Sequence, residues 1–406
     1  VDYIEAHATS TQVGDATELS ALASLVSKNI RSGHQIPIGS VKANIGHTLE
    51  TAGLASLVKV VLAMEHGQIP PGSTCKTPNE DFDWQDGPFT LPRTLGPWPR
   101  PVSGVRTAAV NAFGIGGLNV HVALREYQAV EKTQPIEATS PEPVAIIGAG
   151  CVLPDALDRE AFFALLQSGR SAIGSVPEDR WDADRVLDPS APRTHHITAA
   201  LGGFVRGFEY DWRRHKVPPK QIAAADPLQF MLLESADSAL ADAGLLEKGF
   251  DRTRTGVIVG TMFGGDFRNQ LQMGLRLPET GRIFRGLLHD RGVPSSDIER
   301  IIAAYEEKVL KRYPSLVDET GSFTSSTLAS RLTKTFDLMG SALAFDAGNC
   351  SGAMAVAAAL DMLRSGENDM VLCAAGDRYL DLAAFEDLSL SSRLAVEPTS
   401  PSGTGQ

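Results

Sequence analysis

The chain has 406 residues, of which 43% are hydrophobic and 21% charged, a balance typical of a globular protein with room for two domains. Its net charge is -12 without any dense Lys/Arg block, which argues against a nucleic-acid-binding or anionic-membrane surface. No uncharged apolar run could span a bilayer. The four cysteines are far apart, which favours neither disulfides nor a metal site and fits a cytoplasmic location.

The first 128 residues alternate strand-like and helical segments. Val1–Ile4 is strand-like, lacks an initiating Met and runs directly into a histidine-containing string, so we interpret the chain as a piece of a longer polypeptide. Residues 37–41 predict a strand, and 51–64 predict a buried helix with small residues for close packing. Residues 129–143 are rich in Glu, Thr, Pro and Ser, which predicts an extended linker.

A second domain is expected over 144–406. Residues 144–150 (VAIIGAG) predict an apolar strand that ends in a glycine turn. Dinucleotide binding is disfavoured, because Leu153 stands where the third glycine of the Gly-x-Gly-x-x-Gly pattern belongs. Downstream, a helix should start at Asp226-Pro227, and a charged helical insertion is expected between about residues 282 and 318.

Three strings carry the chemistry: residues 5–15 (EAHATSTQVGD), 42–47 (KANIGH) and 111–122 (NAFGIGGLNVHV). In this order they resemble the signatures of β-ketoacyl synthases, the carbon–carbon bond-forming domains of fatty acid and polyketide synthases. The resemblance implies an α/β, thiolase-like layered fold with mixed sheets and buried helices. It divides the chain into the C-terminal part of one ketosynthase domain (1–128) and the N-terminal part of a second (144–406).

The resemblance also implies roles for side chains of the first two strings. In the family, a malonyl thioester loses carbon dioxide and the resulting enolate attacks an acyl group held on a cysteine. His7 and His47 would donate N–H groups to the oxygen that becomes negative, and the Lys42 ammonium would keep a histidine neutral by like-charge repulsion. Ala8 and Ser10 stand where the family usually has glycine, so we expect a stiffer loop beside His7.

Four further residues are assigned to substrate handling by the same resemblance. Thr9 and Thr11 match a Thr-x-Thr pair whose hydroxyls bind the amides of a phosphopantetheine arm. Phe113 and Gly114 match a gate in which an aromatic ring shields the nucleophile. No cofactor is expected to bind directly, because the arm belongs to a partner acyl carrier protein, and no metal site is expected.

The nucleophile itself is missing from both parts of the chain. In the first part it would lie before Val1. In the second, residues 346–354 (DAGNCSGAM) resemble the nucleophile turn, and counting from either end places Asn349 in the cysteine slot. Three alternatives remain open: Asn349 caps the following helix, its carboxamide binds an enolate, or Cys350 is a displaced nucleophile, although packing in the interior suits Cys350 better.

The sequence therefore predicts an acyltransferase of the ketosynthase type that condenses malonyl and acyl thioesters. The second domain would be a non-condensing, chain-length-factor-like partner in a pseudo-heterodimer, within a homodimeric synthase that includes other domains. The direct tandem and the helical insertion resemble polyunsaturated fatty acid synthases, and polyketide synthesis remains open. The alternatives are an inactive interaction fragment and an intrachain pairing of the two halves. A degradative thiolase is disfavoured, because residues 113–116 hold no cysteine.

Overall fold

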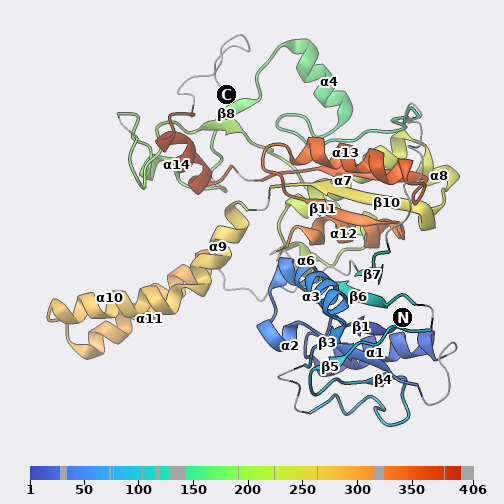
Figure 1. Cartoon of the computed structure of the whole chain (residues 1–406). Coiled ribbons are helices and arrows are strands. Elements are labelled where there is room, and N and C mark those ends of the chain that lie inside the picture. Colours follow the sequence, from blue (N-terminus) through green and yellow to red (C-terminus); the bar gives the residue numbers. More distant parts are fainter. Residues whose placement is uncertain are drawn as a thin grey trace. The chain divides into compact units, whose positions relative to one another are not determined.

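The structure is a computed structural model, and the chain divides into two compact units, Val1–Thr139 and Ser140–Gln406, which are described separately (Figure 1). The described residues are 1–27, 34–72, 75, 77–102, 104–114, 119–128, 142–190, 192–223, 225–262, 264–313, 324–378 and 380–394. The linker expected at 129–143 lies outside them except for its last two residues.

The first unit contains a five-stranded mixed sheet of order β4-β2-β1-β6-β7. Adjacent strands of this sheet run parallel, except that β6 and β7 form an antiparallel hairpin. These strands are β1 (Tyr3–Glu5), β2 (Ile36–Gly39), β4 (Phe89–Thr90), β6 (Thr107–Phe113) and β7 (Asn119–Arg125). Two short strands, β3 (Gln68–Ile69) and β5 (Gly96–Pro97), pair separately. The helices are α1 (Gln12–Val26), α2 (Lys42–Ile45), the 3-10 turn η1 (Leu49–Thr51) and α3 (Ala52–His66).

Two apolar clusters cover the two faces of this sheet. Side chains of a strand alternate between faces, and Tyr3 joins the cluster beneath α3 while its neighbour Ile4 joins the cluster beneath α1. Val60 of α3 and Leu19 of α1 are among the buried residues that fill these layers. The first unit is therefore a helix–sheet–helix sandwich.

The prediction that α3 is a buried helix is only half correct. One face of α3 is buried, with Val60 0% exposed, but Leu54, Val58 and Leu62 on the opposite side are exposed. The small and apolar residues all around this helix suggested burial on every side. Within the first unit, the β6 side of the helix is the covered side.

The second unit contains a three-stranded parallel sheet of order β11-β10-β12 and a separate antiparallel pair, β8 with β9. Helices α13 and α12 lie on opposite faces of the three-stranded sheet (Figure 1). The strands are β8 (Ile173–Ser175), β9 (Leu201–Gly203), β10 (Thr255–Gly260), β11 (Ala342–Phe345) and β12 (Met370–Ala375). The helices are α4 (Arg159–Ser168), α5 (Trp212–His215), α6 (Pro219–Ala223), α7 (Leu228–Asp242), α8 (Leu245–Lys248), α9 (Asp266–Leu275), α10 (Leu277–Asp290), α11 (Ser295–Arg312), α12 (Ser326–Phe336), α13 (Ser351–Arg364) and α14 (Leu382–Leu390), with 3-10 turns η2 (Ala183–Arg185) and η3 (Arg252–Arg254).

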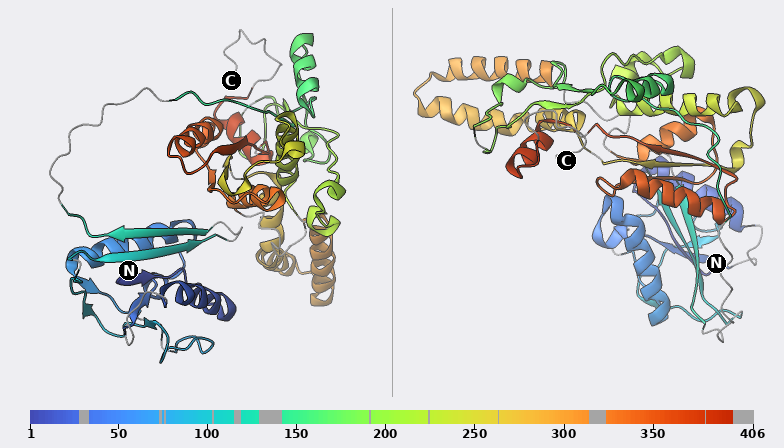
Figure 2. Two further views of the ribbon diagram at one scale, coloured as in Figure 1. Left: turned by 90° about the vertical axis from the view of Figure 1, so that its right-hand side faces the viewer. Right: turned by 90° about the horizontal axis from the view of Figure 1, so that it is seen from above.

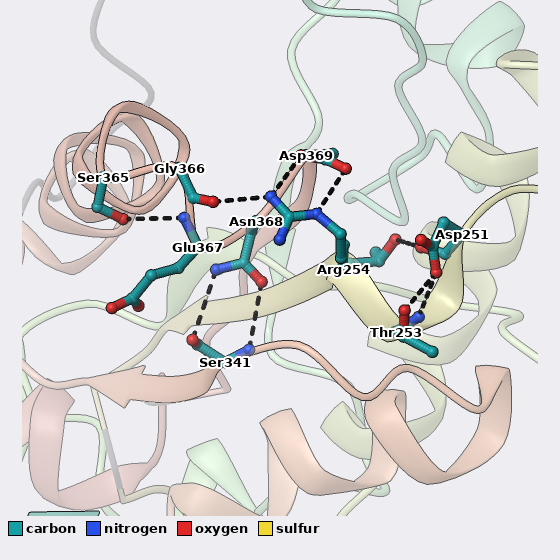
Figure 3. A network of polar contacts seen from close by, with 10 residues as sticks. Asp251, Thr253, Arg254, Ser341, Ser365, Gly366, Glu367, Asn368 and Asp369 are labelled. Carbon is teal, nitrogen blue, oxygen red and sulfur yellow. Dashed lines mark hydrogen bonds and ion pairs between the residues drawn. The ribbon is translucent and has the colours of Figure 1, made fainter.

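A polar network ties together the amino ends of the three parallel strands (Figure 3). Arg254, just before β10, donates two hydrogen bonds of 2.7 Å to the carboxylate of Asp369, just before β12. Asn368 binds the backbone N–H of Ser341, just before β11, at 3.3 Å. The opposite, carboxyl ends of the strands are the edge at which parallel sheets commonly form ligand sites.

The strand predicted at 144–150 is not formed. The segment is extended but pairs with no strand in the described part of the chain, and Ile146 is 92% exposed. It lies instead against α7, where a Cβ at Gly148 would come 2.3 Å from the Ala239 carbonyl oxygen and one at Gly150 would come 2.1 Å from that of Ser235. The two glycines therefore serve close packing on a helix.

The helix predicted at Asp226-Pro227 begins at Leu228, with Pro227 at its N-cap position, and the charged insertion is helical as predicted. Helices α10 and α11 form a hairpin that extends from α9 away from the sheet of the second unit (Figures 1 and 2). The helical part of the insertion that the structure describes ends at Arg312, and residues 314–323 lie outside the described residues.

Candidate active site

The carboxyl ends of β1, β2 and β6 bring three of the predicted residues together. His7 follows β1, His47 follows β2 and α2, and Phe113 ends β6. The imidazole centroids of His7 and His47 are 5.8 Å apart with their planes at 84°, and the Phe113 ring lies 5.1 Å from that of His7. The structure thus places in one cluster residues that are up to 106 positions apart in the sequence.

Backbone hydrogen bonds fix the tautomer of both imidazoles. The N–H of Phe113 donates to His7 Nδ1 at 3.2 Å, and the N–H of Leu49 donates to His47 Nδ1 at 3.0 Å. A neutral imidazole whose Nδ1 accepts a hydrogen bond carries its proton on Nε2. Each histidine therefore presents one Nε2–H donor.

The turn that carries His47 depends on an unusual backbone conformation. Gly46 has φ 79° and ψ -180°, a combination that is essentially restricted to glycine. Leu49, whose N–H orients the His47 ring, has a positive φ of 50°. Strained residues of this kind cluster at functional sites, where the surrounding structure holds a side chain in one position.

The surroundings of His7 favour its neutral form. Burial, followed by repulsion from the Lys42 ammonium, lowers the pKa of His7 below its ordinary value, although the Glu18 carboxylate opposes the shift. Burial also lowers the pKa of Lys42, against the attraction of Glu5 and Glu18. A neutral imidazole can donate a hydrogen bond to a developing oxyanion without first protonating a carbanion.

Glu18 is a positioning residue whose role the sequence did not indicate. Its buried carboxylate accepts hydrogen bonds from the backbone N–H groups of His7 (2.9 Å) and Ala8 (3.0 Å) and from Nδ2 of Asn111 (2.8 Å). The Asn111 Oδ1 in turn lies 2.6 Å from His121 Nδ1. The carboxylate joins α1, the histidine loop and β6, so it determines where His7 lies.

A second buried carboxylate supports the Lys42 turn. Glu5 is 0% exposed, pairs with the ammonium of Lys59 at 2.7 Å, and accepts hydrogen bonds from the Tyr3 hydroxyl and the Val41 N–H. Val41 immediately precedes Lys42. Burial, with the adjacent Glu5 carboxylate, raises the pKa of Tyr3 well above its usual value, which keeps its hydroxyl protonated as a donor.

The structure describes only some of the residues that were assigned to the pantetheine arm and to the gate. The hydroxyl oxygens of Thr9 and Thr11 are 3.4 Å apart and exposed, and the Phe113 ring packs against that of His7 with the two planes tilted by 45°. Gly114 follows β6, but the rest of the gate, 115–118, lies outside the described residues. Among the described residues, Thr11 and Lys42 line a cavity of 660 Å³, which His7 and His47 do not line.

In the second unit, Asn349 follows β11 and lines a separate cavity of 520 Å³. The expectation that Asn349 caps the next helix is wrong, because α13 begins at Ser351 with Cys350 at the N-cap position. The turn is held by the Ser351 hydroxyl, which accepts the N–H of Ala347 at 2.9 Å and donates to the Gly348 carbonyl at 2.6 Å. Cys350 is exposed rather than buried, because its position at the start of the helix leaves the thiol on the surface of this unit.

Profiles of known protein families match residues in both units. The profile of the β-ketoacyl synthase N-terminal domain matches residues 141–403, and that of the C-terminal domain matches residues 1–76. The chain belongs to the β-ketoacyl synthase family. A third profile, the ketoacyl-synthetase C-terminal extension, matches residues 78–151. In this chain, the C-terminal domain of the ketosynthase pattern therefore precedes the N-terminal domain.

The relatives of this ketosynthase chain include large synthases. It is 35% identical to the pikromycin polyketide synthase component PikAIII of Streptomyces venezuelae over 50% of this chain and 13% of that protein. It is 43% identical to the polyketide synthase ThaG of Burkholderia thailandensis over 53% of this chain and 5% of that protein. A solved structure titled PfaC Keto synthase-Chain length factor covers 91% of this chain at 28% identity with a TM-score of 0.71, and the chain spans 38% of it. The thiolase-like ketosynthase fold is thus confirmed.

None of the helices in the described part of the ketosynthase chain combines the length and apolar character needed to cross a membrane. The cytoplasmic location inferred from the cysteines stays a prediction, as does the expectation that no cofactor binds directly.

Proposed function

We propose that the first unit supplies the enolate-stabilising half of a β-ketoacyl synthase active site. The observation that carries the proposal is the pair of Nε2–H donors on His7 and His47, each fixed by a backbone N–H on Nδ1. The ring centroids are 5.8 Å apart, and in this proposal both Nε2–H groups donate to the same oxygen. A fixed donor of this kind contributes about 3–4 kcal/mol to transition-state stabilisation.

The reaction is a decarboxylative Claisen condensation. The bond between the malonyl α-carbon and its carboxylate breaks, carbon dioxide leaves, and the electron pair remains as an enolate whose oxygen accepts from His7 and His47. The enolate carbon then attacks the carbonyl of an acyl thioester and expels the cysteine thiolate. Cys75, the sole cysteine in the sequence of the first unit, lines the 660 Å³ cavity rather than the histidine cluster, so we assign the acyl-carrying thiol to another part of the synthase.

The malonyl and acyl groups would arrive on the phosphopantetheine arm of an acyl carrier protein. The exposed hydroxyls of Thr9 and Thr11, 3.4 Å apart, can each exchange a hydrogen bond with an amide of such an arm. The ring of Phe113 would shield the reacting carbon from water, because it packs against the His7 imidazole.

The second unit would be a chain-length-factor-like partner that does not condense. Asn349 stands in the nucleophile slot, and an amide cannot form the thioester intermediate. The similarity to a structure titled as a ketosynthase with a chain length factor supports this assignment. We further propose that the two ketosynthase-like domains form a pseudo-heterodimer in the synthase.

Malonyl-thioester decarboxylation by the full chain tests the first unit, because this step needs no acyl-cysteine. Carbon dioxide release from a malonyl carrier protein should fall about 100- to 1000-fold in His7→Ala and in His47→Ala. His66→Ala, which replaces an exposed histidine of α3, is the matched control and should retain the rate. A wild-type chain without activity would support the alternative of an interaction fragment.

A second experiment tests the second unit. The chain is incubated with a radiolabelled acyl thioester, and labelled peptides are mapped by mass spectrometry. We expect no label on Cys350. Label on Cys350 that disappears in Cys350→Ser would mean that the second unit is itself a condensing domain.

A further inference from the structure

The hairpin of α10 and α11, called the helical arm below, carries an exposed apolar face. On its inner side α10 packs against α11, where the rings of Phe284 and Tyr305 lie 5.4 Å apart and Ile302 is 2% exposed. On its outer side, Ile283 and Leu287 are 59% and 58% exposed. These two residues are four positions apart and therefore neighbours on one helix face.

Large apolar side chains are also exposed at the end of α9, where the arm begins. Leu275 and Met273, in the last turn of α9, are 58% and 48% exposed. Single exposed apolar residues are ordinary, but several large ones on two consecutive helices mark an interaction surface. In the described part of the chain, nothing covers this surface.

Charged residues flank the apolar face symmetrically. Arg276 lies seven positions before Ile283 and Asp290 seven positions after it, which is nearly two helical turns in each direction, so all three share a face. The side chains of Arg276 and Asp290 are 69% and 79% exposed. Their local partners, Glu279 and His289, are 3.7 Å away, and such surface pairs contribute little.

We propose that α10 pairs with α10 of a second copy of this chain, antiparallel, about a two-fold axis at Ile283. A two-fold axis exchanges positions equally far from it, so Arg276 of each copy faces Asp290 of the other. Ile283 of the two copies meets on the axis, and Leu287 of each copy lies against the aliphatic part of the Glu279 side chain of the other. A parallel pairing would set Arg276 against Arg276 and Asp290 against Asp290, so the charges select the antiparallel orientation. This inference does not depend on the proposed reaction.

The oligomeric state of the full chain tests the pairing. Sedimentation velocity over a concentration series should show a monomer–dimer equilibrium in the wild type. Ile283→Glu should raise the dimer dissociation constant at least tenfold, because it buries a charge on the axis. Leu246→Glu, which changes an exposed leucine of α8, is the matched control and should leave the constant unchanged. A wild-type chain that stays monomeric at all concentrations overturns the proposal.

Charge reversal tests the antiparallel orientation of the two α10 helices. It also keeps the proposal testable if the Ile283→Glu variant does not fold. Arg276→Glu and Asp290→Arg should each weaken the dimer, and the double variant should restore it, because the pair is re-formed with opposite polarity. Ile283→Cys should give a disulfide-linked dimer on mild oxidation, above the background of the wild-type cysteines. If the dimer survives Ile283→Glu and the Ile283→Cys variant crosslinks no more than the wild type, the proposal is overturned, since the dimer must then form elsewhere.

Discussion

The backbone N–H of Phe113 donates a hydrogen bond of 3.2 Å to His7 Nδ1, which ties the imidazole after β1 to the end of β6. The same two residues pack ring against ring at 5.1 Å. The proton on His7 is thereby confined to Nε2, on the side of the ring that faces away from the backbone donor. The protonation and orientation of His7 thus depend on β6 as much as on its own loop.

Replacing Lys42 with Met should raise the pKa of His7. Lys42→Met removes a positive charge that disfavours the imidazolium, and the opposing Glu18 remains. The measurement is an NMR titration of the His7 ring protons. His7 in the wild type should stay neutral to a lower pH than an ordinary imidazole and should become protonated at a higher pH in the variant.

The control for this titration is Arg100→Met. Arg100 is an exposed cation that is not among the groups that shift His7, so its loss should leave the titration midpoint in place. If Lys42→Met leaves the midpoint unchanged, the ammonium does not act on His7, and burial together with His47 accounts for the lowered pKa.

Glu18→Ala should destabilise the first unit by about 3 kcal/mol, because three donors lose a buried acceptor and each unsatisfied group costs roughly 1–3 kcal/mol. Hydrogen-exchange mass spectrometry on peptides of the first unit measures the loss separately from the second unit. Removing this carboxylate should also lower the pKa of His7 further, since Glu18 raises it. A variant with unchanged exchange around residues 7 and 8 would contradict the positioning role.

Replacing Ala8 or Ser10 with glycine should stabilise the first unit by about 0.5–1 kcal/mol. Both residues have a positive φ, 38° and 63°, which costs a non-glycine residue about 1–2 kcal/mol, and glycine loses part of that gain through its greater unfolded-state entropy. Ala6→Gly is the control: Ala6 is 5% exposed without a positive φ, so its replacement should destabilise the unit instead. Equal effects at positions 6 and 8 would show that backbone strain is unimportant here.

The elements that the sequence predicted correctly are those with a local signature. The strand predicted at 37–41 is formed at 36–39, and the helix predicted at 51–64 is formed at 52–66, because hydrophobic patterning is a local signal. The assignment of His7 and His47 to one site came instead from the resemblance of short strings to family signatures. The stiffer loop expected at Ala8 and Ser10 stays a prediction, and their positive φ was not anticipated from the sequence.

What the sequence did not predict depends on tertiary contacts. Residues 144–150 have the composition of a strand, yet a strand requires a pairing partner. Glu18 and Glu5 look like ordinary charged residues, because burial of a carboxylate is set by donors from distant segments such as Asn111 and Lys59. The turn before α13 is held by the Ser351 hydroxyl, which accepts the N–H of Ala347, and the sequence did not single out this contact.

The buried ion pair between Lys59 and Glu5 can be tested for its contribution to the stability of the turn that carries Lys42. Lys59→Met should destabilise the first unit by about 3–5 kcal/mol, because it leaves the Glu5 charge unpaired in a site that is 0% exposed. Adding Glu5→Gln to this variant should recover much of the loss, since no uncompensated charge then remains.

The comparison with an exposed pair makes the test specific. Arg100 and Glu126 are 2.9 Å apart, but the Arg100 side chain is 64% exposed, so Arg100→Met should cost no more than about 1 kcal/mol. Glu5 also accepts the Val41 N–H. Lys59→Met should therefore speed amide exchange at residues 41–47, the segment that carries Lys42 and His47, whereas Arg100→Met should not. If the double variant is no more stable than Lys59→Met alone, the lost stability reflects packing of the lysine stem rather than the unpaired carboxylate.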